Sequence, residues 1–191
     1  KKIPREHFVP DRVKGLAYID EDLHLGNGRY LMAPSVHARM VEACALNVND
    51  TVLDVGVTYG YSAAILAQHV KTVFALDNDE TFAEFATNAW HDIDVYNAIY
   101  FVGDLEVGDT GHAPFSVIFF NGALAAVPEH YFEQLAIGGR LCCVIRPDPT
   151  NVGCAMLYQR LENDVISRRN LFDAATPYLP GFEPVTYFEF A

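Results

Sequence analysis

Hydrophobic and polar positions change their spacing repeatedly along residues 36–145 of the chain. Short runs that are apolar at nearly every position are typical of strands buried on both faces, whereas apolar residues three and four positions apart are typical of helices. The pattern predicts strands over 51–56, 72–77, 98–102, 115–120 and 140–145. It predicts helices over 36–46, 61–70, 80–90 and 128–135. Ser35 is expected to cap the first helix, and Gly138 and Gly139 are expected to end the last.

Strands that alternate with helices predict a mostly parallel sheet with helices on both faces, which is a Rossmann-like α/β arrangement. The pattern changes after residue 150. Segments 154–161 and 165–172 flank a polar turn and predict an antiparallel hairpin, and 185–190 alternates like an edge strand. We therefore expect a single domain over 1–191. Its parts would be an irregular lead-in (1–35), a βα core (36–150) and C-terminal strands (151–191).

Composition narrows the range of partners. The chain carries 13 Lys and Arg against 25 Asp and Glu, and this formal net charge of −12 disfavours binding to nucleic-acid phosphates or anionic lipids. The four cysteines form no CxxC pair and are typical of reduced core thiols, which predicts a cytoplasmic protein. Seven histidines lack metal-ligand spacing. No metal site, nucleic-acid partner or membrane partner is therefore expected.

Glycines and aspartates mark the ends of three predicted strands. Gly56 and Gly60 lie in the turn after the first strand, where a residue without a Cβ lets the backbone approach a ligand. Asp77 ends the second strand, where it is placed to bind two ribose hydroxyls. Asp104 follows the third strand, where its carboxylate is placed to accept a hydrogen bond from the amino group of an adenine. Each acid alone is as often a solvated strand end, but acids after consecutive strands suit a nucleoside better than a pyrophosphate. The joint spacing predicts an S-adenosylmethionine site, and Asp54 completes the set of predicted cofactor-binding residues.

Six blocks of sequence carry a more specific signal. They are IPREHFVP (3–10), AYIDEDLHLGNGR (17–29), APSVHARM (33–40), VLDVGVTYGYSAAILA (52–67), GDLEVGDTGHAPFSVIFF (103–120) and VPEHYFEQLAIGGRL (127–141). In this order the blocks resemble those of protein-L-isoaspartate O-methyltransferases. The resemblance implies a class I methyltransferase fold with S-adenosylmethionine as cofactor. It also implies methylation of isoaspartyl carboxylates in damaged proteins or peptides, as a repair reaction of the cytoplasm.

The cofactor loop departs from the pattern of that family. By the resemblance, Gly56 and Gly60 match the outer glycines of the loop, Asp77 the ribose-binding acid and Asp104 the acid beside adenine. The family's loop commonly reads acid-x-Gly-Thr-Gly-Ser-Gly, and its middle glycine is Thr58 here. Because a β-branched side chain stands where the backbone should pass the ligand, we expect weak cofactor binding.

The predicted substrate segment departs as well. Residues 28–32 read Gly-Arg-Tyr-Leu-Met, where the family commonly has Gly-Gln-Thr-Ile-Ser. Met32 replaces the serine and offers no hydroxyl group, so no catalytic residue is assigned. Arg29 has the chemistry to grip a substrate carboxylate but is expected to be an ordinary surface arginine.

Two functions therefore stay open. The first is a carboxyl methyltransferase, in which positioning and desolvation carry catalysis because a carboxylate is nucleophilic without a strong base. The second is a degenerate family member with weak or no cofactor binding that acts as a binding or interaction module. The clustering of departures at the cofactor loop and substrate segment supports the second, but the methyltransferase is the function that we predict and the binding module is the alternative.

Overall fold

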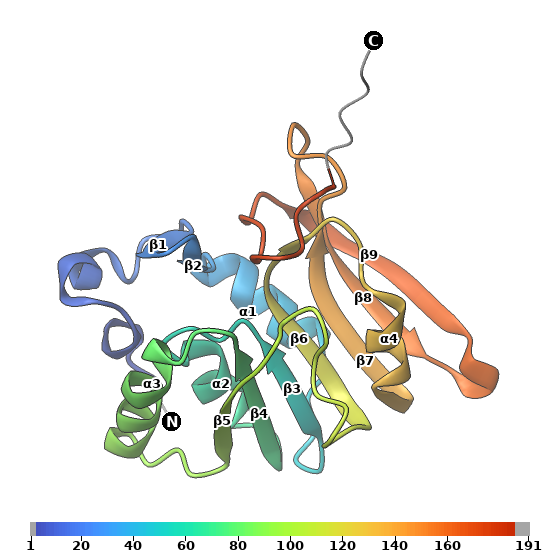
Figure 1. Ribbon diagram of the computed structural model, residues 1–191, viewed down its shortest axis with the longest axis horizontal. Coiled ribbons are helices and arrows are strands. Elements are labelled where there is room, and N and C mark those ends of the chain that lie inside the picture. Colours follow the sequence, from blue (N-terminus) through green and yellow to red (C-terminus); the bar gives the residue numbers. More distant parts are fainter. Residues whose placement is uncertain (1–2, 186–191) are drawn as a thin grey trace.

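The computed structural model describes residues 3–185, and a seven-stranded sheet dominates it (Figure 1). The strands lie in the order β5-β4-β3-β6-β7-β8-β9. They are β3 (Thr51–Val55), β4 (Thr72–Asp77), β5 (Ala98–Val102), β6 (Phe115–Leu124), β7 (Leu135–Ile145), β8 (Gly153–Arg160) and β9 (Ile166–Ala174). The five strands β3, β4, β5, β6 and β7 run parallel to one another. β8 and β9 form an antiparallel hairpin beside β7. The predicted fold class is therefore confirmed.

Helices cover both faces of the sheet, as the strand pattern predicts. The four α-helices among residues 3–185 are α1 (Pro34–Ala43), α2 (Tyr61–Leu66), α3 (Thr81–Asp92) and α4 (Glu129–Glu133). Buried side chains of α1, α2 and α3 share one hydrophobic layer with Val52 and Phe119, whereas Tyr131 of α4 packs in a second layer with Leu53 and Phe120. No helix within this part of the chain is long and apolar enough to cross a membrane.

The start of α1 differs from the prediction. Pro34 is the first helical residue, and Ser35 lies inside the helix rather than capping it. Pro suits this position because its fixed φ is helical and it has no N–H that needs a partner. Two aspartates of the lead-in take over the capping role. Asp22 accepts a hydrogen bond from the Ala33 N–H (2.9 Å) and Asp20 accepts one from the Ser35 N–H (2.9 Å).

Three helices end earlier than predicted, and the first of them, α1, ends at Ala43 rather than at residue 46. α2 ends at Leu66 instead of continuing to residue 70, because the next residues tighten into turns with bonds from Gln68 N–H to Ile65 O and from His69 N–H to Leu66 O. α4 ends at Glu133, and β7 begins at Leu135 rather than at residue 140. Leu135 is already paired with Phe115 of β6, so sheet pairing ends the helix and the two glycines lie within the strand.

The lead-in is more regular than expected. It contains the 3-10 helices η1 (Arg5–Phe8) and η2 (Asp11–Leu16) and a hairpin of β1 (Leu23–Gly26) and β2 (Arg29–Leu31). Buried leucines alternate with polar residues around an Asn-Gly turn, and this pattern is a strong hairpin signal that the Pro- and Gly-rich composition obscured. A third 3-10 helix, η3 (Glu162–Asp164), joins β8 to β9. All but the first residue of the strand predicted over 185–190 lie outside the described residues.

The two hydrophobic layers meet at a pair of neighbouring cysteines on β7. Cys142 belongs to the layer under α1, α2 and α3, and Cys143 to the layer on the other face. Successive side chains of a strand point to opposite faces, which explains the division. Both thiols are free and buried, and burial raises the pKa of Cys143.

Candidate functional site

The turn from β3 into α2 keeps the path of a glycine-rich loop. Gly56 (φ 77°) and Gly60 (φ 87°) are both left-handed, as residues without a Cβ readily are. Thr58 is left-handed too, with φ 49°. Its N–H donates to Oδ2 of Asp77 (2.8 Å), and the Gly56 N–H donates to the carbonyl of Leu76 (2.8 Å). These two bonds fix the loop against the end of β4.

Asp77 lies at the carboxyl end of β4 and is fully buried. Besides the Thr58 N–H it accepts a bond from the Asp79 N–H (3.3 Å) and a short contact from Nη2 of Arg29. Burial raises the pKa of Asp77, and the positive charge of Arg29 opposes that shift. All of these donors come from the protein itself.

Arg29 is not the surface residue that the sequence suggested. Its side chain is 3% exposed, and its guanidinium carbon lies 5.9 Å from the ring centroid of Phe82. The β2 strand carries it over the end of β4, so the carboxylate it grips is that of Asp77 in its own chain. Its Nη1 atom is buried and has no hydrogen-bond partner among the described residues.

Asp54 lies on β3 beside Asp77 but points into the interior. Its Oδ1 accepts bonds from Nδ2 of Asn121 (2.6 Å) and from the hydroxyl of Ser62 (3.0 Å), and its Oδ2 has no partner among the described residues. Burial raises the pKa of Asp54 to about 8, against the effect of these two hydrogen bonds. At neutral pH this shift favours the protonated form of the carboxyl group, which is held beneath the loop by Asn121 and Ser62.

Asp104 follows β5 and is exposed, with its Oδ1 accepting a bond from the Glu106 N–H (2.8 Å). The preceding Gly103 donates its N–H to the backbone carbonyl of Asp77 (2.9 Å). Asp54, Asp77 and Asp104 thus occupy the carboxyl ends of three adjacent parallel strands, β3, β4 and β5, as the sequence predicted.

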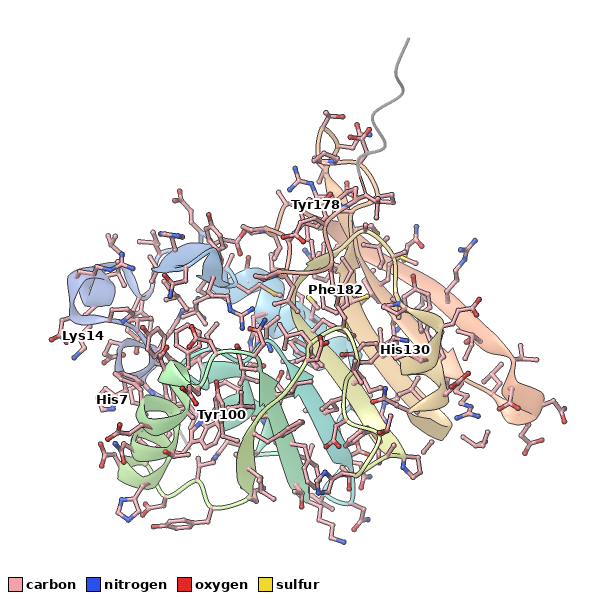
Figure 2. The ribbon with its side chains drawn as sticks, in the orientation of Figure 1. His7, Lys14, Tyr100, His130, Tyr178 and Phe182 are labelled. Carbon is pink, nitrogen blue, oxygen red and sulfur yellow. The ribbon has the colours of Figure 1, made fainter. Side chains whose placement is uncertain are left out.

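Residues 175–182, hereafter the covering segment, cross the same end of the sheet (red in Figure 1). Ala123 of β6 donates to the carbonyl of Pro177 (2.8 Å) and accepts from the Leu179 N–H (2.9 Å). The Ala125 N–H donates to the carbonyl of Phe182 (2.8 Å). Tyr178 and Phe182 both lie at this end of the sheet (Figure 2). The covering segment is therefore fixed by backbone bonds and not only by side chains.

The side chain of Leu179 lies directly against Gly56. A methyl group on Gly56 would collide with it, and the remaining cavity between the loop, Arg29 and the covering segment measures about 10 Å³. That volume is about the room that one water molecule needs. Gly60, the second glycine, is close to protein as well, because the indole of Trp90 lies where its Cβ would be and donates Nε1–H to its carbonyl (2.9 Å).

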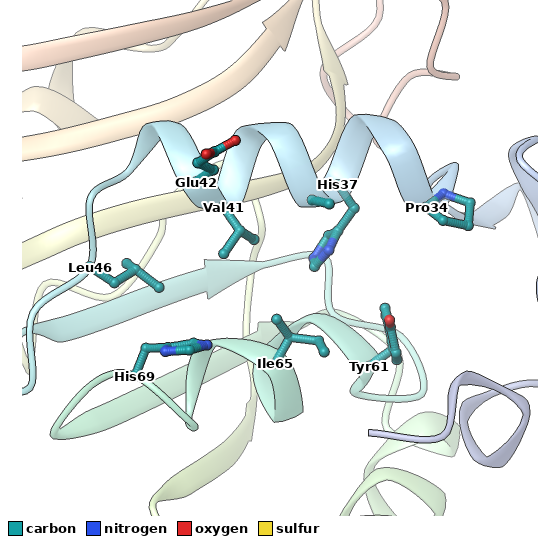
Figure 3. Close-up of a pocket in the computed structure, with 9 residues that line it drawn as sticks. Pro34, His37, Val41, Glu42, Leu46, Tyr61, Ile65 and His69 are labelled. Carbon is teal, nitrogen blue, oxygen red and sulfur yellow. The ribbon is translucent and has the colours of Figure 1, made fainter. Parts of the chain in front are cut away.

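The predicted substrate segment is equally occupied. Met32 is buried, and its carbonyl accepts a bond from Nη2 of Arg5 (2.6 Å). The guanidinium carbon of Arg5 lies 4.8 Å from the ring centroid of Tyr61. A larger cavity of about 380 Å³ lies elsewhere, between α1 and α2, where His37 and Ile65 line it (Figure 3). It does not reach the strand ends that carry the predicted cofactor residues.

A model of the protein-L-isoaspartate (D-aspartate) O-methyltransferase family matches residues 1–180. The chain belongs to this methyltransferase family. A protein-L-isoaspartate O-methyltransferase from Ignicoccus hospitalis is 35% identical over 83% of this chain and 75% of its own length. One from Roseiflexus is 34% identical over 90% of this chain and 78% of its own length. Protein-L-isoaspartate O-methyltransferase 2 from Pelobacter propionicus is 36% identical over 74% of this chain. The matched region spans 63% of that relative's length.

Solved structures of isoaspartate methyltransferases share the fold. One superposes with a TM-score of 0.81 at 24% identity, covering 96% of this chain and 60% of its own. Another, from Plasmodium falciparum, was solved in complex with S-adenosyl-L-homocysteine. It has a TM-score of 0.77 at 18% identity and covers 93% of this chain and 86% of its own. The chain therefore has the class I methyltransferase fold.

The cofactor expected of such a methyltransferase does not fit the cleft in this conformation. Asp77, the acid predicted to bind the ribose, forms an ion pair with Arg29, the space over Gly56 is filled by Leu179, and the remaining cavity admits no nucleoside. The acids predicted to bind the cofactor are present, but the cavity beside them is too small to hold it.

Sequence reasoning missed the residues that fill the site. Arg29 was placed on the surface, and Leu179 was not considered. The Pro-Gly pair after Leu179 signals a turn, but no spacing in the sequence connects position 179 with position 56. Asn121, which holds Asp54, was missed for the same reason.

Proposed function

We propose that this chain is an S-adenosylmethionine-dependent methyltransferase that acts on isoaspartyl carboxylates of damaged proteins and peptides. The observation that carries the proposal is the family match over residues 1–180. The three acids at the carboxyl ends of β3, β4 and β5 support it, because they occupy the end of the sheet where α/β folds bind their ligands.

Methylation of a carboxylate does not require a catalytic side chain that acts as a strong base. An isoaspartyl carboxylate is ionised at neutral pH and is already nucleophilic, so its methylation needs a positioned acceptor and a site without water rather than a strong base. Met32 in place of a serine is compatible with such a reaction. The net charge of −12 and the free thiols support a protein substrate met in the reducing cytoplasm, and they disfavour a nucleic-acid substrate.

A methyl-transfer assay tests the proposal. The protein is incubated with methyl-labelled S-adenosylmethionine and either an isoaspartyl peptide or the same peptide with ordinary aspartate. We expect base-labile label in the isoaspartyl peptide and background label in the aspartyl control. Equal background in both peptides, under conditions in which an isoaspartate methyltransferase of this family labels the first, would contradict the proposal.

One observation favours a second function, a binding module without turnover. The cleft is filled by Arg29 and Leu179, so the conformation described here has no place for the cofactor. The family match puts this function second. It would be preferred if the protein neither transferred label nor bound S-adenosylhomocysteine.

A further inference from the structure

We propose that the chain closes its own cofactor cleft, with Arg29 taking the place of the ribose hydroxyls on Asp77 and Leu179 filling the space over Gly56. The identity of the displaced ligand rests on the proposed function. The two closing residues come from opposite ends of the sequence, Arg29 from the lead-in hairpin and Leu179 from the covering segment.

The first argument is the occupancy of the Asp77 carboxylate. Its Oδ1 faces Arg29 and the Asp79 N–H, and its Oδ2 faces the Thr58 N–H. A carboxylate has about four acceptor positions, and Arg29 and the two N–H groups already take three of them on this fully buried side chain, which leaves too few for two hydroxyls. A ribose diol can reach this acid only after Arg29 has moved.

The second argument is the rigidity of the Leu179 contact. The backbone of Leu179 is bonded to Ala123, and its backbone N lies 3.0 Å from where a Cβ on Gly122 would be. A rotamer change alone would leave this backbone over the strand ends. The covering segment must therefore separate from β6 before a nucleoside can enter.

The third argument is that the closed state is imperfect. Nη1 of Arg29 is a buried donor without an acceptor among the described residues. A static structural ion pair would be expected to satisfy its donors. An arginine that leaves when a ligand arrives regains solvent for that donor, so opening removes an unfavourable feature of the closed state.

Titration calorimetry with S-adenosylhomocysteine tests the closure. The proteins compared are the unaltered chain, Arg29→Ala, Leu179→Ala and the double variant. We expect each single variant to bind at least about tenfold more tightly than the unaltered chain, and the double variant more tightly still. Arg12→Ala is the matched control for Arg29, because Arg12 is another lead-in arginine whose guanidinium donates a hydrogen bond, to the carbonyl of Leu25, without touching Asp77.

Leu171→Ala, on β9, is the control for Leu179, because it removes the same side chain away from the cleft. Neither control should tighten binding. The closure is overturned if the unaltered chain binds as tightly as the variants, or if even the double variant binds no S-adenosylhomocysteine.

A hydrogen-exchange measurement tests the closure on the unaltered chain and so does not depend on whether a variant folds. The N–H groups of Leu179 and Ala125 should exchange faster when S-adenosylhomocysteine is added, and unchanged or slower exchange at saturating ligand overturns the closure.

The closure and the methyltransferase activity fail in different ways. Tighter binding by the variants with no label in either peptide keeps the closure and removes the activity. Methylation by the unaltered chain with equal affinities throughout keeps the activity and removes the closure.

Discussion

Asp54 shows how far a single residue can differ from the role its position suggests. The sequence places it among cofactor-binding acids, and the structure places it on the expected strand. Within residues 3–185, its carboxyl group nevertheless accepts hydrogen bonds only from Ser62 and Asn121, under the loop. Its direct part in cofactor binding stays a prediction, and its support of the loop is what the geometry shows.

The raised pKa of Asp54 makes stability depend on pH. Between the unfolded pKa of about 3.9 and the folded pKa of about 8, the folded chain holds one proton more than the unfolded chain. The free energy of unfolding attributable to Asp54 is then largest below the unfolded value, and it falls by up to about 1.4 kcal/mol per pH unit as pH rises through this window.

Asp54→Asn should therefore lose less stability than the unaltered chain between pH 5 and pH 8. Urea unfolding at several pH values measures the difference, and Asp104→Asn, at an exposed position, is the control. Parallel stability profiles for Asp54→Asn and the unaltered chain would show that Asp54 is ionised in both states.

Thr58 is the other residue whose role changed. The sequence suggested that its side chain would meet the cofactor, yet its backbone adopts the left-handed conformation that glycine favours and directs its N–H to Asp77. The loop path thus survives the loss of glycine at this position. Contact between the cofactor and the Thr58 side chain stays a prediction.

At the scale of elements, the loop between β3 and α2 depends on Gly60. A Cβ there would lie 2.8 Å from the indole of Trp90, at a φ that other residues rarely adopt. We expect Gly60→Ala to lower the free energy of unfolding by about 2–4 kcal/mol through strain and overpacking together.

Gly28→Ala is the matched control for this prediction. Gly28 is also left-handed (φ 70°), but nothing lies within 4 Å of its missing Cβ. It should lose only the conformational part, about 1 kcal/mol. Denaturant unfolding compares the two, and equal losses would mean that the indole of Trp90 moves aside without cost.

Elements with one clear period were predictable, and elements decided by contacts were not. The parallel core was predictable because its strands are buried on both faces. Their sequences are therefore short runs that are apolar at nearly every position, which differ from the three- and four-residue spacing of a helix. The boundary between α4 and β7 was missed because pairing with Phe115 decides it. The candidate site divides in the same way. Strand ends placed the three acids, but the contact of Leu179 with Gly56 joins distant parts of the chain and leaves no local pattern.

At the scale of the whole molecule, the lead-in hairpin and the covering segment lie together over one end of the sheet. The lead-in hairpin brings Arg29 to β4, and the covering segment brings Leu179 to the loop after β3. The same end of the sheet holds the three acids. Stability and ligand access are therefore linked, because the contacts that close the cleft also attach both terminal segments to the core.

The neighbouring cysteines of β7 have a practical consequence for labelling kinetics. Cys142 and Cys143 are adjacent in sequence but are buried in different layers, so a thiol reagent reaches each only when its own layer opens. Variants Cys142→Ala and Cys143→Ala, followed by mass spectrometry, report the two layers separately. We expect equal rates for the two thiols, because one sheet carries both layers and should open cooperatively. Rates that differ by more than about tenfold would instead reveal that one face of the sheet opens while the other stays folded.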